Sequence, residues 1–498
     1  MPPATPLELA GSASSSPARH PRGLYTLFFT EMWERFSYYG MRALLVLFMV
    51  EATRTGGLGL TDEVATAIYG LYTAAVYLAA LPGGWVADRF LGAQRSVWYG
   101  GIIIACGHFT LAVPRKEFFY LGLILVVVGT GLLKPNVSAI VGELYPEGGA
   151  RRDAGFTVFY MGINLGAALG PLVCSALGER VNWHYGFAAA GVGMVLGLTQ
   201  YRLSARHLGE AGRTPGYREG VRTTDRLLLA ALSGGLGLAV VLVFAGVIRF
   251  DPVTMARATT YIIASVALVY FVCVFLFCHL DRAEMARVAV IAVLFLASAV
   301  FWSGFEQAGS SLNLFAERYT QRLFFNHTIP AGWFQSLGAV FVILLAPVVA
   351  GVWVRLARRN VNPSVPLKFA FGLVLLGAGF LVMAGASQLV VVGHKAWPTW
   401  LVSTYLLHSL GELCLSPVGL SSVTKLAPRR LVGQMMGIWF LGTSMGNLLA
   451  GLIAGKFSAE TVSEMPVRYL GIVATTAGTG ILLALLSRLI QRLMRGVE

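Results

Sequence analysis

Charged residues are scarce in this chain. Asp, Glu, Lys and Arg together make up 12% of its 498 residues, against roughly 25% in typical soluble domains. Hydrophobic residues make up 56%, and the mean hydropathy is +0.69. This composition excludes an ordinary soluble domain and indicates a protein that lies largely within a lipid bilayer.

Cysteine is also rare. The five cysteines lie in apolar runs without metal-ligand spacing, so we expect buried free thiols and no bound metal. The sequence shows no nucleophile–base pair, metal-ligand cluster or phosphate-binding loop, which argues against an enzyme and against an organic cofactor. The cysteines are Cys106, Cys174, Cys273, Cys278 and Cys414.

The net charge of +14 could suggest a nucleic-acid partner, but the placement of the charges argues against one. With the N-terminus inside, most Lys and Arg residues fall at cytoplasmic helix ends. We therefore expect the lipid bilayer as a partner and no nucleic acid, with both termini cytoplasmic. Residues 1–23 are rich in Pro, Ser and Ala and predict a disordered cytoplasmic tail instead of a cleavable signal; residues 491–498 predict a second tail.

Long apolar runs recur along the chain. A helix needs about 20 such residues to cross a bilayer, so the runs predict an all-α membrane protein with about fourteen transmembrane helices. The expected spans are residues 24–50, 65–85, 96–113, 118–141, 156–176, 185–203, 227–248, 261–279, 288–314, 333–354, 369–386, 400–423, 435–454 and 469–490.

The spans divide into two halves with a spacer. Six spans form an expected N-terminal bundle, 24–203, and six form a C-terminal bundle, 288–490. Between them lie a polar, Arg-rich cytoplasmic loop, 204–226, and a two-helix insertion, 227–279, without charge at membrane depth. Two related six-helix bundles describe the major facilitator fold, whose substrate site lies at the midplane between the halves.

The first span carries four charged residues, Glu31, Glu34, Arg35 and Arg42. Each charge at the centre of a membrane helix costs about 2.5–3.5 kcal/mol even on a lenient insertion scale. Glu31 and Arg35 are four residues apart and therefore share a helix face. Such a cluster is tolerable when the charges pair or face water, so this face is expected to be functional.

Other polar residues at membrane depth are few. The first half adds Lys134 and Asn164, and the second half adds Glu306 and Glu412. A cavity between the halves would be cationic on one wall and anionic on the other, which suits a zwitterion such as a short peptide. Aromatic residues would supply walls with polar edges: Tyr38, Tyr39, Tyr77, Trp302, Phe305 and Trp439. Close helix contact is expected at Gly162, Gly166 and Gly170.

Five segments resemble the signatures of the proton-dependent oligopeptide transporters, a branch of the major facilitators. The first, at 31–40, reads Glu-x-x-Glu-Arg-Phe-x-Tyr-Tyr-Gly. The others lie in order at 129–138, 159–166, 301–307 and 411–417. The resemblance also explains the inserted helix pair, which bacterial members of that family carry.

The resemblance implies roles for individual residues. An ion pair between Glu306 and Arg42 would close the outer gate. The implied proton-coupling residues are Glu31, Glu34, Arg35, Glu306, Arg42 and Lys134. The implied peptide-binding residues are Arg35, Tyr38, Tyr39, Tyr77, Lys134, Asn164, Trp302, Glu412, Ser416 and Trp439, with Asn164 and Glu412 at the amino end of the peptide.

The chain departs from the family pattern at two places. Gly338 and Ala339 replace an Asn-Pro pair whose Asn helps to hold the peptide ammonium. One hydrogen bond to an ammonium is worth about 1.5–3 kcal/mol, so affinity is expected to fall or preference to shift. Gly70 replaces a histidine of animal relatives, so coupling is expected to depend on carboxylates, with His108 and His408 as secondary candidates.

We therefore expect a proton-coupled symporter that imports di- and tripeptides across a bacterial plasma membrane by alternating access. It is expected to act as a monomer without a cofactor. The alternative cargo is another peptide-like or amino-acid-derived solute, which competition by dialanine would distinguish. A peptide sensor would require a large signalling domain, and the sequence contains only short polar tails.

Overall fold

The computed structural model describes residues 20–147, 149–215, 221–248, 250–361, 363–457 and 459–494. Most of the expected tail 1–23 and half of the expected tail 491–498 lie outside these residues. Within the described ranges the regular secondary structure is helical except for one hairpin, β1 (Leu323–Phe324) and β2 (His327–Thr328). The helices are α1 (Arg22–Val50), α2 (Asp62–Val86), α3 (Ala93–Leu111), α4 (Lys116–Glu143), α5 (Gly149–Arg180), α6 (Trp183–Ser204), α7 (Thr223–Phe244), α8 (Pro252–Phe277), α9 (Arg282–Phe305), α10 (Ser311–Tyr319), α11 (Trp333–Arg358), α12 (Val365–Val391), α13 (Pro398–Leu426), α14 (Val432–Ala454) and α15 (Met465–Met494).

Each expected span falls on one long helix, with one exception. The span predicted over 288–314 is broken: α9 ends at Phe305, a 3₁₀ turn covers Glu306–Gly309, and α10 follows. The break is held by tertiary contacts, because the Gln307 side chain donates to the Ala450 carbonyl and Asn313 donates to the Ala43 carbonyl. An apolar run does not reveal such contacts, so the prediction of a continuous helix was wrong here.

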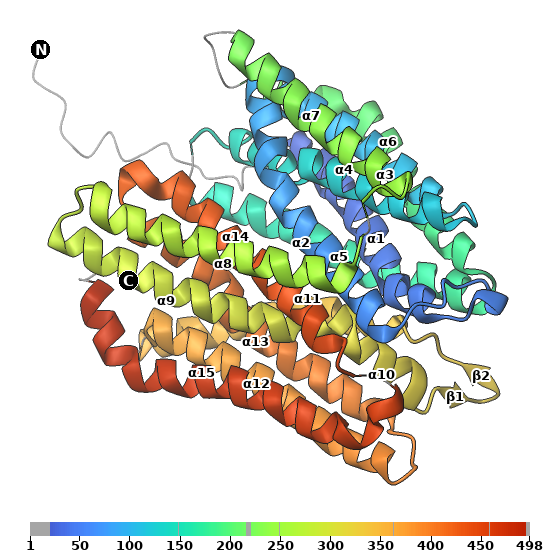
Figure 1. The fold of residues 1–498 in the computed structure, drawn as a ribbon. Helices are drawn as coiled ribbons and strands as arrows, with labels where there is room; N and C mark the ends of the chain where they lie inside the picture. Colours follow the sequence, from blue (N-terminus) through green and yellow to red (C-terminus); the bar gives the residue numbers. More distant parts are fainter. Residues whose placement is uncertain are drawn as a thin grey trace, which may run out of the picture.

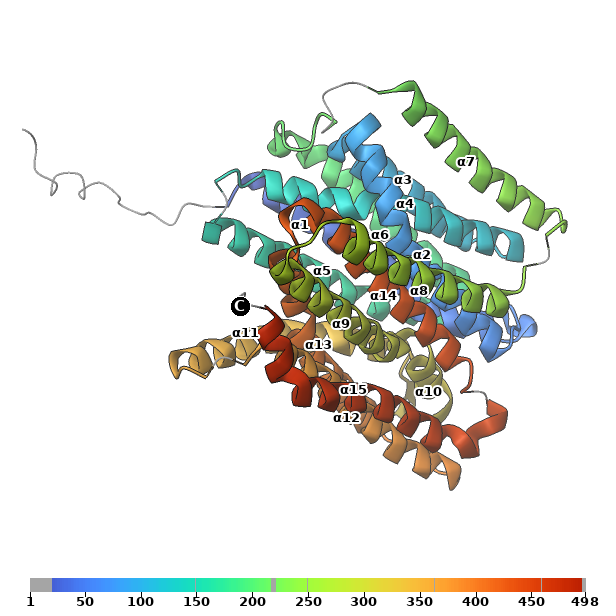
Figure 2. The same ribbon diagram turned by 60° about the vertical axis from the view of Figure 1, so that its left-hand side comes forward.

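The helices form two bundles (Figure 1). Helices α1 to α6 pack on one another, as do α9 and α11 to α15. The bundles meet where α2 lies against α14 and α5 lies against α11. The inserted helix α8 packs on α2 and α14, whereas α7 has no buried residue and lies at the outer edge (Figure 2). This is the major facilitator architecture that the sequence predicts.

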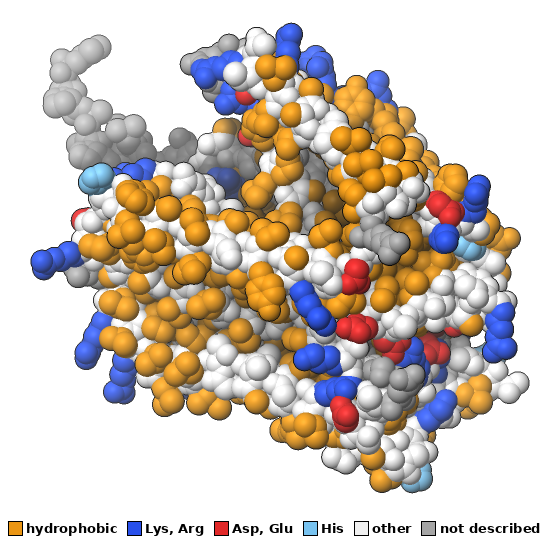
Figure 3. Space-filling model, in the orientation of Figure 1, with side chains coloured by type: hydrophobic (Ala, Val, Ile, Leu, Met, Phe, Trp, Pro, Cys, Tyr) orange, Lys and Arg blue, Asp and Glu red, His pale blue; other side chains and the backbone are white. Residues whose placement is uncertain are grey.

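The molecule has two ends along the direction of its helices (Figure 1). The terminal side holds the start of α1 and the end of α15, and the hairpin side holds β1 and β2 (Figure 1). Hydrophobic side chains form a broad band between these ends, and charged side chains gather at the ends (Figure 3). Among the described residues, ten helical segments are long and apolar enough to cross a membrane. The chain is a multi-pass membrane protein.

Glycine allows α1 and α5 to touch. A Cβ atom at Gly166 would lie 2.1 Å from the Met32 carbonyl oxygen, and one at Gly170 would lie 2.3 Å from the Phe36 carbonyl oxygen. Gly162 makes a similar approach to the same helix. The expected close contact at these three glycines is therefore confirmed, and it fixes the charged face of α1 against α5.

Replacement of Gly166 by alanine is expected to prevent normal assembly of the N-terminal bundle, because the added methyl group would overlap the α1 backbone. Gly478→Ala is the matched control, since a Cβ atom there meets no atom within 4 Å. We expect the control to melt at or above the wild-type temperature, because alanine favours a helix over glycine by about 1 kcal/mol. Thermal unfolding of both purified variants measures this; equal melting would contradict the packing argument.

The cysteines only partly follow the sequence-based expectation. Cys174 and Cys414 are buried and Cys278 is half-buried, but Cys106 and Cys273 are exposed on α3 and α8. The expectation of buried thiols was wrong for these two. The reason is that a residue in an apolar membrane-spanning segment can face either the lipid or the protein core, and the sequence pattern does not distinguish the two.

Candidate functional site

A cavity of about 380 Å³ lies between the two bundles. Its volume falls within the range of about 300–1,000 Å³ that is usual for small-molecule sites. Its walls come from α1, α2, α4 and α5 on one side and from α9, α11, α13 and α14 on the other. The expected site residues that line it are Glu31, Arg35, Tyr39, Arg42, Tyr77, Lys134, Asn164, Trp302, Glu306, Glu412, Ser416 and Trp439.

Two expected residues lie behind the cavity wall. Glu34 is 1% exposed and forms an ion pair with Arg35, at 2.5 Å between Oε2 and Nε. Tyr38 is 5% exposed, and its ring stacks on that of Tyr72 with centroids 6.3 Å apart. Both are positioned to act on the cavity through their neighbours, and a role in proton coupling or peptide binding stays a prediction for them.

The N-terminal wall holds two carboxylates around one guanidinium. Arg35 Nε lies 2.9 Å from Glu31 Oε1 in addition to its contact with Glu34. Arg35 lines the cavity, and its Nη2 is buried without a hydrogen-bond partner. Lys134 Nζ lies 4.0 Å above the Tyr77 ring, and within the described ranges no carboxylate lies within 4.0 Å of it. Lys134 is therefore the cation that an incoming anion can reach.

A buried ion pair crosses between the bundles. Arg42 of α1 contacts Glu306, which sits at the break after α9, and the two residues are 6% and 4% exposed. Arg42 Nε also donates to the Tyr69 hydroxyl. Sequence reasoning missed Tyr69, because its partner lies on another helix and a lone tyrosine in an apolar run carries no signal of its own. The helix break itself directs Glu306 toward Arg42.

The hairpin side of the cavity is closed by further bonds between the bundles. Arg318 of α10 contacts Asp62 of α2 through two hydrogen bonds of 2.6 and 2.8 Å. The Glu179 carboxylate at the end of α5 accepts from the backbone N–H groups of Ala331 and Gly332, at 2.6 and 2.9 Å. Charge-assisted bonds of this kind are among the stronger ones in proteins. Together with the Arg42 pair they hold this end shut.

The terminal side of the cavity is open. Leu420 of α13 and Phe440 of α14 line that end and are 44% and 40% exposed. The structure therefore represents one state of the molecule, with access from the terminal side and closure at the hairpin side.

The C-terminal wall offers an anion. Glu412 of α13 lines the cavity, and among the described residues no cation lies within 4.0 Å of its carboxylate. Trp302 and Trp439 lie on the same wall and supply apolar surface. The cavity thus presents a reachable ammonium, Lys134, from one bundle and a reachable carboxylate, Glu412, from the other. This arrangement suits a ligand that carries both charges.

The two histidines that the sequence offers as secondary proton-coupling candidates, His108 and His408, are poorly placed for proton transfer along the cavity. His108 is fully buried in α3 and does not line the cavity. His408 lines it but is 2% exposed and packs against Phe380, with ring centroids 4.7 Å apart.

Cavity residues that the sequence did not single out include Tyr160, Gln335, Tyr405 and Thr443. They are common polar residues, and only their neighbours across helices distinguish them.

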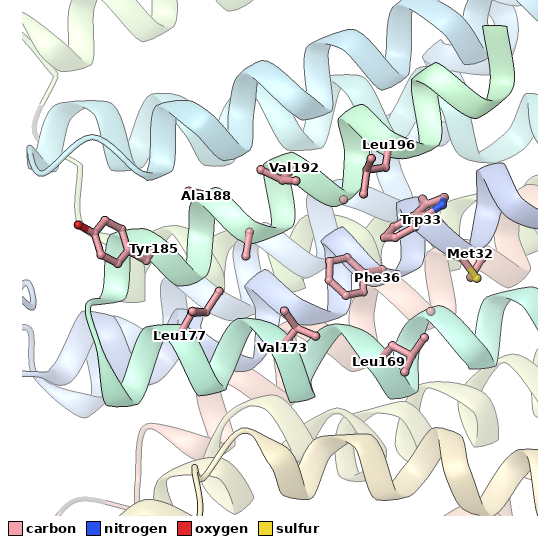
Figure 4. Close-up of a pocket in the computed structure, with 13 residues that line it drawn as sticks. Met32, Trp33, Phe36, Leu169, Val173, Leu177, Tyr185, Ala188, Val192 and Leu196 are labelled. Atoms are coloured by element: carbon pink, nitrogen blue, oxygen red, sulfur yellow. The ribbon is translucent and has the colours of Figure 1, made fainter. Parts of the chain in front are cut away.

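A second hollow lies on the surface between α1, α5 and α6 (Figure 4). It measures about 630 Å³, and its lining is almost wholly apolar, with side chains such as Phe36, Leu169 and Val192. No charged side chain lines it, so it does not suit a zwitterion.

Within the described residues, no cluster of three His, Cys, Asp or Glu side chains is placed to hold a metal ion.

Comparisons with known proteins agree with this geometry. A family model described as the POT family matches residues 94–471. A peptide transporter of Yersinia enterocolitica, YePEPT, is 43% identical over 495 residues, covering 96% of each chain. A di-/tripeptide transporter of Lactococcus lactis is 37% identical, covering 96% of this chain and 97% of its own. A solved peptide transporter in complex with alafosfalin is 40% identical, with a TM-score of 0.88 over 96% of each chain.

Proposed function

The chain belongs to the POT family of transporters, and we propose that it imports di- and tripeptides together with protons. The observation that carries this proposal is the opposition of Lys134 and Glu412 across one cavity. A peptide carboxylate would bind Lys134 and Arg35 on the N-terminal wall, and the peptide ammonium would bind Glu412. Asn164 on the same cavity would hold a backbone amide.

Proton coupling is assigned to the Arg42–Glu306 pair. With Glu306 ionised, the pair holds the hairpin side closed. A proton on Glu306 removes the charge that attracts Arg42, so the gate loses its central contact and opens. The N-terminal bundle, 24–203, and the C-terminal bundle, 288–490, would then rock about the cavity and expose it to each side in turn.

The orientation follows from the distribution of charge. Lys and Arg concentrate at the terminal side, which we assign to the cytoplasm with both termini. The membrane is then a bacterial plasma membrane, since the relatives are bacterial transporters. The cavity is built by one chain alone, which supports a monomer as the transport unit.

The test is uptake of labelled dialanine by the purified protein in liposomes. With an inward proton gradient we expect accumulation above the external concentration, and collapse of the gradient by a protonophore should reduce uptake to equilibration. Absence of gradient-driven uptake by folded protein would refute the proposal.

The alternative cargo is another peptide-like or amino-acid-derived solute. Its support is Gly338, where the cavity wall carries no side chain. Competition by excess unlabelled dialanine separates the two cases. Dialanine inhibits uptake by a peptide transporter and does not inhibit uptake by a transporter of another solute.

A further inference from the structure

Helix α11 presents a recessed wall to the cavity. The residues on its cavity face after Gln335 are Gly338, Ala339 and Val342, and none has a side chain longer than valine. A Cβ atom at Gly338 would meet no other atom within 4 Å. The cavity therefore extends up to the helix backbone at this level.

The recess adjoins the free carboxylate of the C-terminal wall. The Ser409 hydroxyl donates to the Gly338 carbonyl oxygen at 3.2 Å, which ties α11 to α13 at this height. Glu412 follows Ser409 by one helical turn and lies on the same cavity-facing side of α13. Gly338 and Glu412 are thus neighbours across the α11–α13 contact.

We propose that the recess at Gly338 is a subsite for the side chain of the substrate residue that carries the free ammonium, and that it favours large apolar side chains there. The inference rests on the proposed function, because the ammonium must pair with Glu412. The first α-carbon is one bond, about 1.46 Å, from the ammonium nitrogen. The first side chain must then begin beside Glu412, where the recess lies.

The walls of the recess define the chemistry of its ligand. Ala339 and Val342 are aliphatic, and burial of apolar surface against them is favourable. Gln335 Nε2 is buried without a hydrogen-bond partner one turn from Gly338, and it limits the apolar stretch toward the hairpin side. The preferred substrates are therefore peptides with leucine, methionine or phenylalanine at the first position.

The experiment measures competition between unlabelled dipeptides and labelled dialanine for purified protein, without a proton gradient. In the wild type we expect Leu-Ala to bind about tenfold more tightly than Ala-Ala. Ala-Leu should bind more tightly than Ala-Ala by a smaller factor. The Gly338→Leu substitution fills the recess. It should bring the ratio of the binding affinities for Leu-Ala and Ala-Ala close to one. Val340→Leu is the matched control, because Val340 is exposed on the outer face of α11 and the ratio should stay at its wild-type value.

Two results would overturn the subsite: a wild-type ratio near one, or a tenfold ratio that survives in folded Gly338→Leu. Gly338→Ala adds one methyl group and should lower the ratio about twofold, which keeps the test decisive if Gly338→Leu fails to fold. Failure of the proposed function looks different, because it removes gradient-driven uptake of dialanine whatever the order of binding affinities.

Discussion

Replacement of Glu306 by glutamine is expected to abolish proton-driven accumulation of dialanine. Glutamine has nearly the same shape as glutamate but carries no charge and cannot titrate near neutral pH. The Arg42 guanidinium then loses its charged partner, and breaking such a buried ion pair costs about 3–5 kcal/mol. We expect gradient-driven uptake to fall by at least about 100-fold.

The same substitution should spare a step that needs no proton. Exchange of labelled for unlabelled peptide across the liposome membrane requires only that the two bundles rock with peptide bound, so we expect Glu306→Gln to retain exchange and to lose its pH dependence. Glu117→Gln is the matched control, since Glu117 lies in the first turn of α4 with a side chain that is 46% exposed. Full gradient-driven uptake by Glu306→Gln would remove Glu306 from the coupling mechanism.

Replacement of Arg35 by alanine is expected to destabilise the folded protein and to abolish transport. Glu31 and Glu34 would be left as neighbouring buried carboxylates, 3% and 1% exposed, without the guanidinium that now contacts both. Loss of one partner from a buried charge cluster costs about 3–5 kcal/mol. We therefore expect a large drop in melting temperature and little folded protein at 37 °C, measured by thermal unfolding in detergent.

A second set of variants separates electrostatics from packing. The triple variant Glu31→Gln, Glu34→Gln and Arg35→Leu removes all three charges and should recover much of the melting temperature, because burial of neutral groups costs less. Transport should stay absent, since the variant lacks the charges assigned to peptide and proton binding. Arg257→Ala removes an exposed ion pair with Glu63 and should change stability by at most about 1 kcal/mol. If Arg35→Ala melts like Arg257→Ala, the buried cluster does not stabilise the fold.

Local patterns allowed much of the fold and part of the site to be read from the sequence. Length and hydropathy predict the helices, because a span is defined by its own residues. The contact between Glu31 and Arg35 follows from helical spacing, and the glycines of α5 predict a close neighbour. The opposite signs of the charges in the two halves indicate a cavity for a zwitterion, and the structure places those charges on its two walls.

The tertiary structure decided whatever depends on residues far apart in the chain. The break at Glu306 is held by bonds to Ala450 and Ala43, and the Tyr69 hydroxyl reaches Arg42 from another helix. The sequence shows that residue 338 is a glycine, but only the assembled bundles show that it faces open space in the cavity that Glu412 also lines. The physical reason is that hydropathy and helical spacing act within one helix, whereas gate contacts, lipid-facing cysteines and the shape of a binding site depend on which helix surfaces meet.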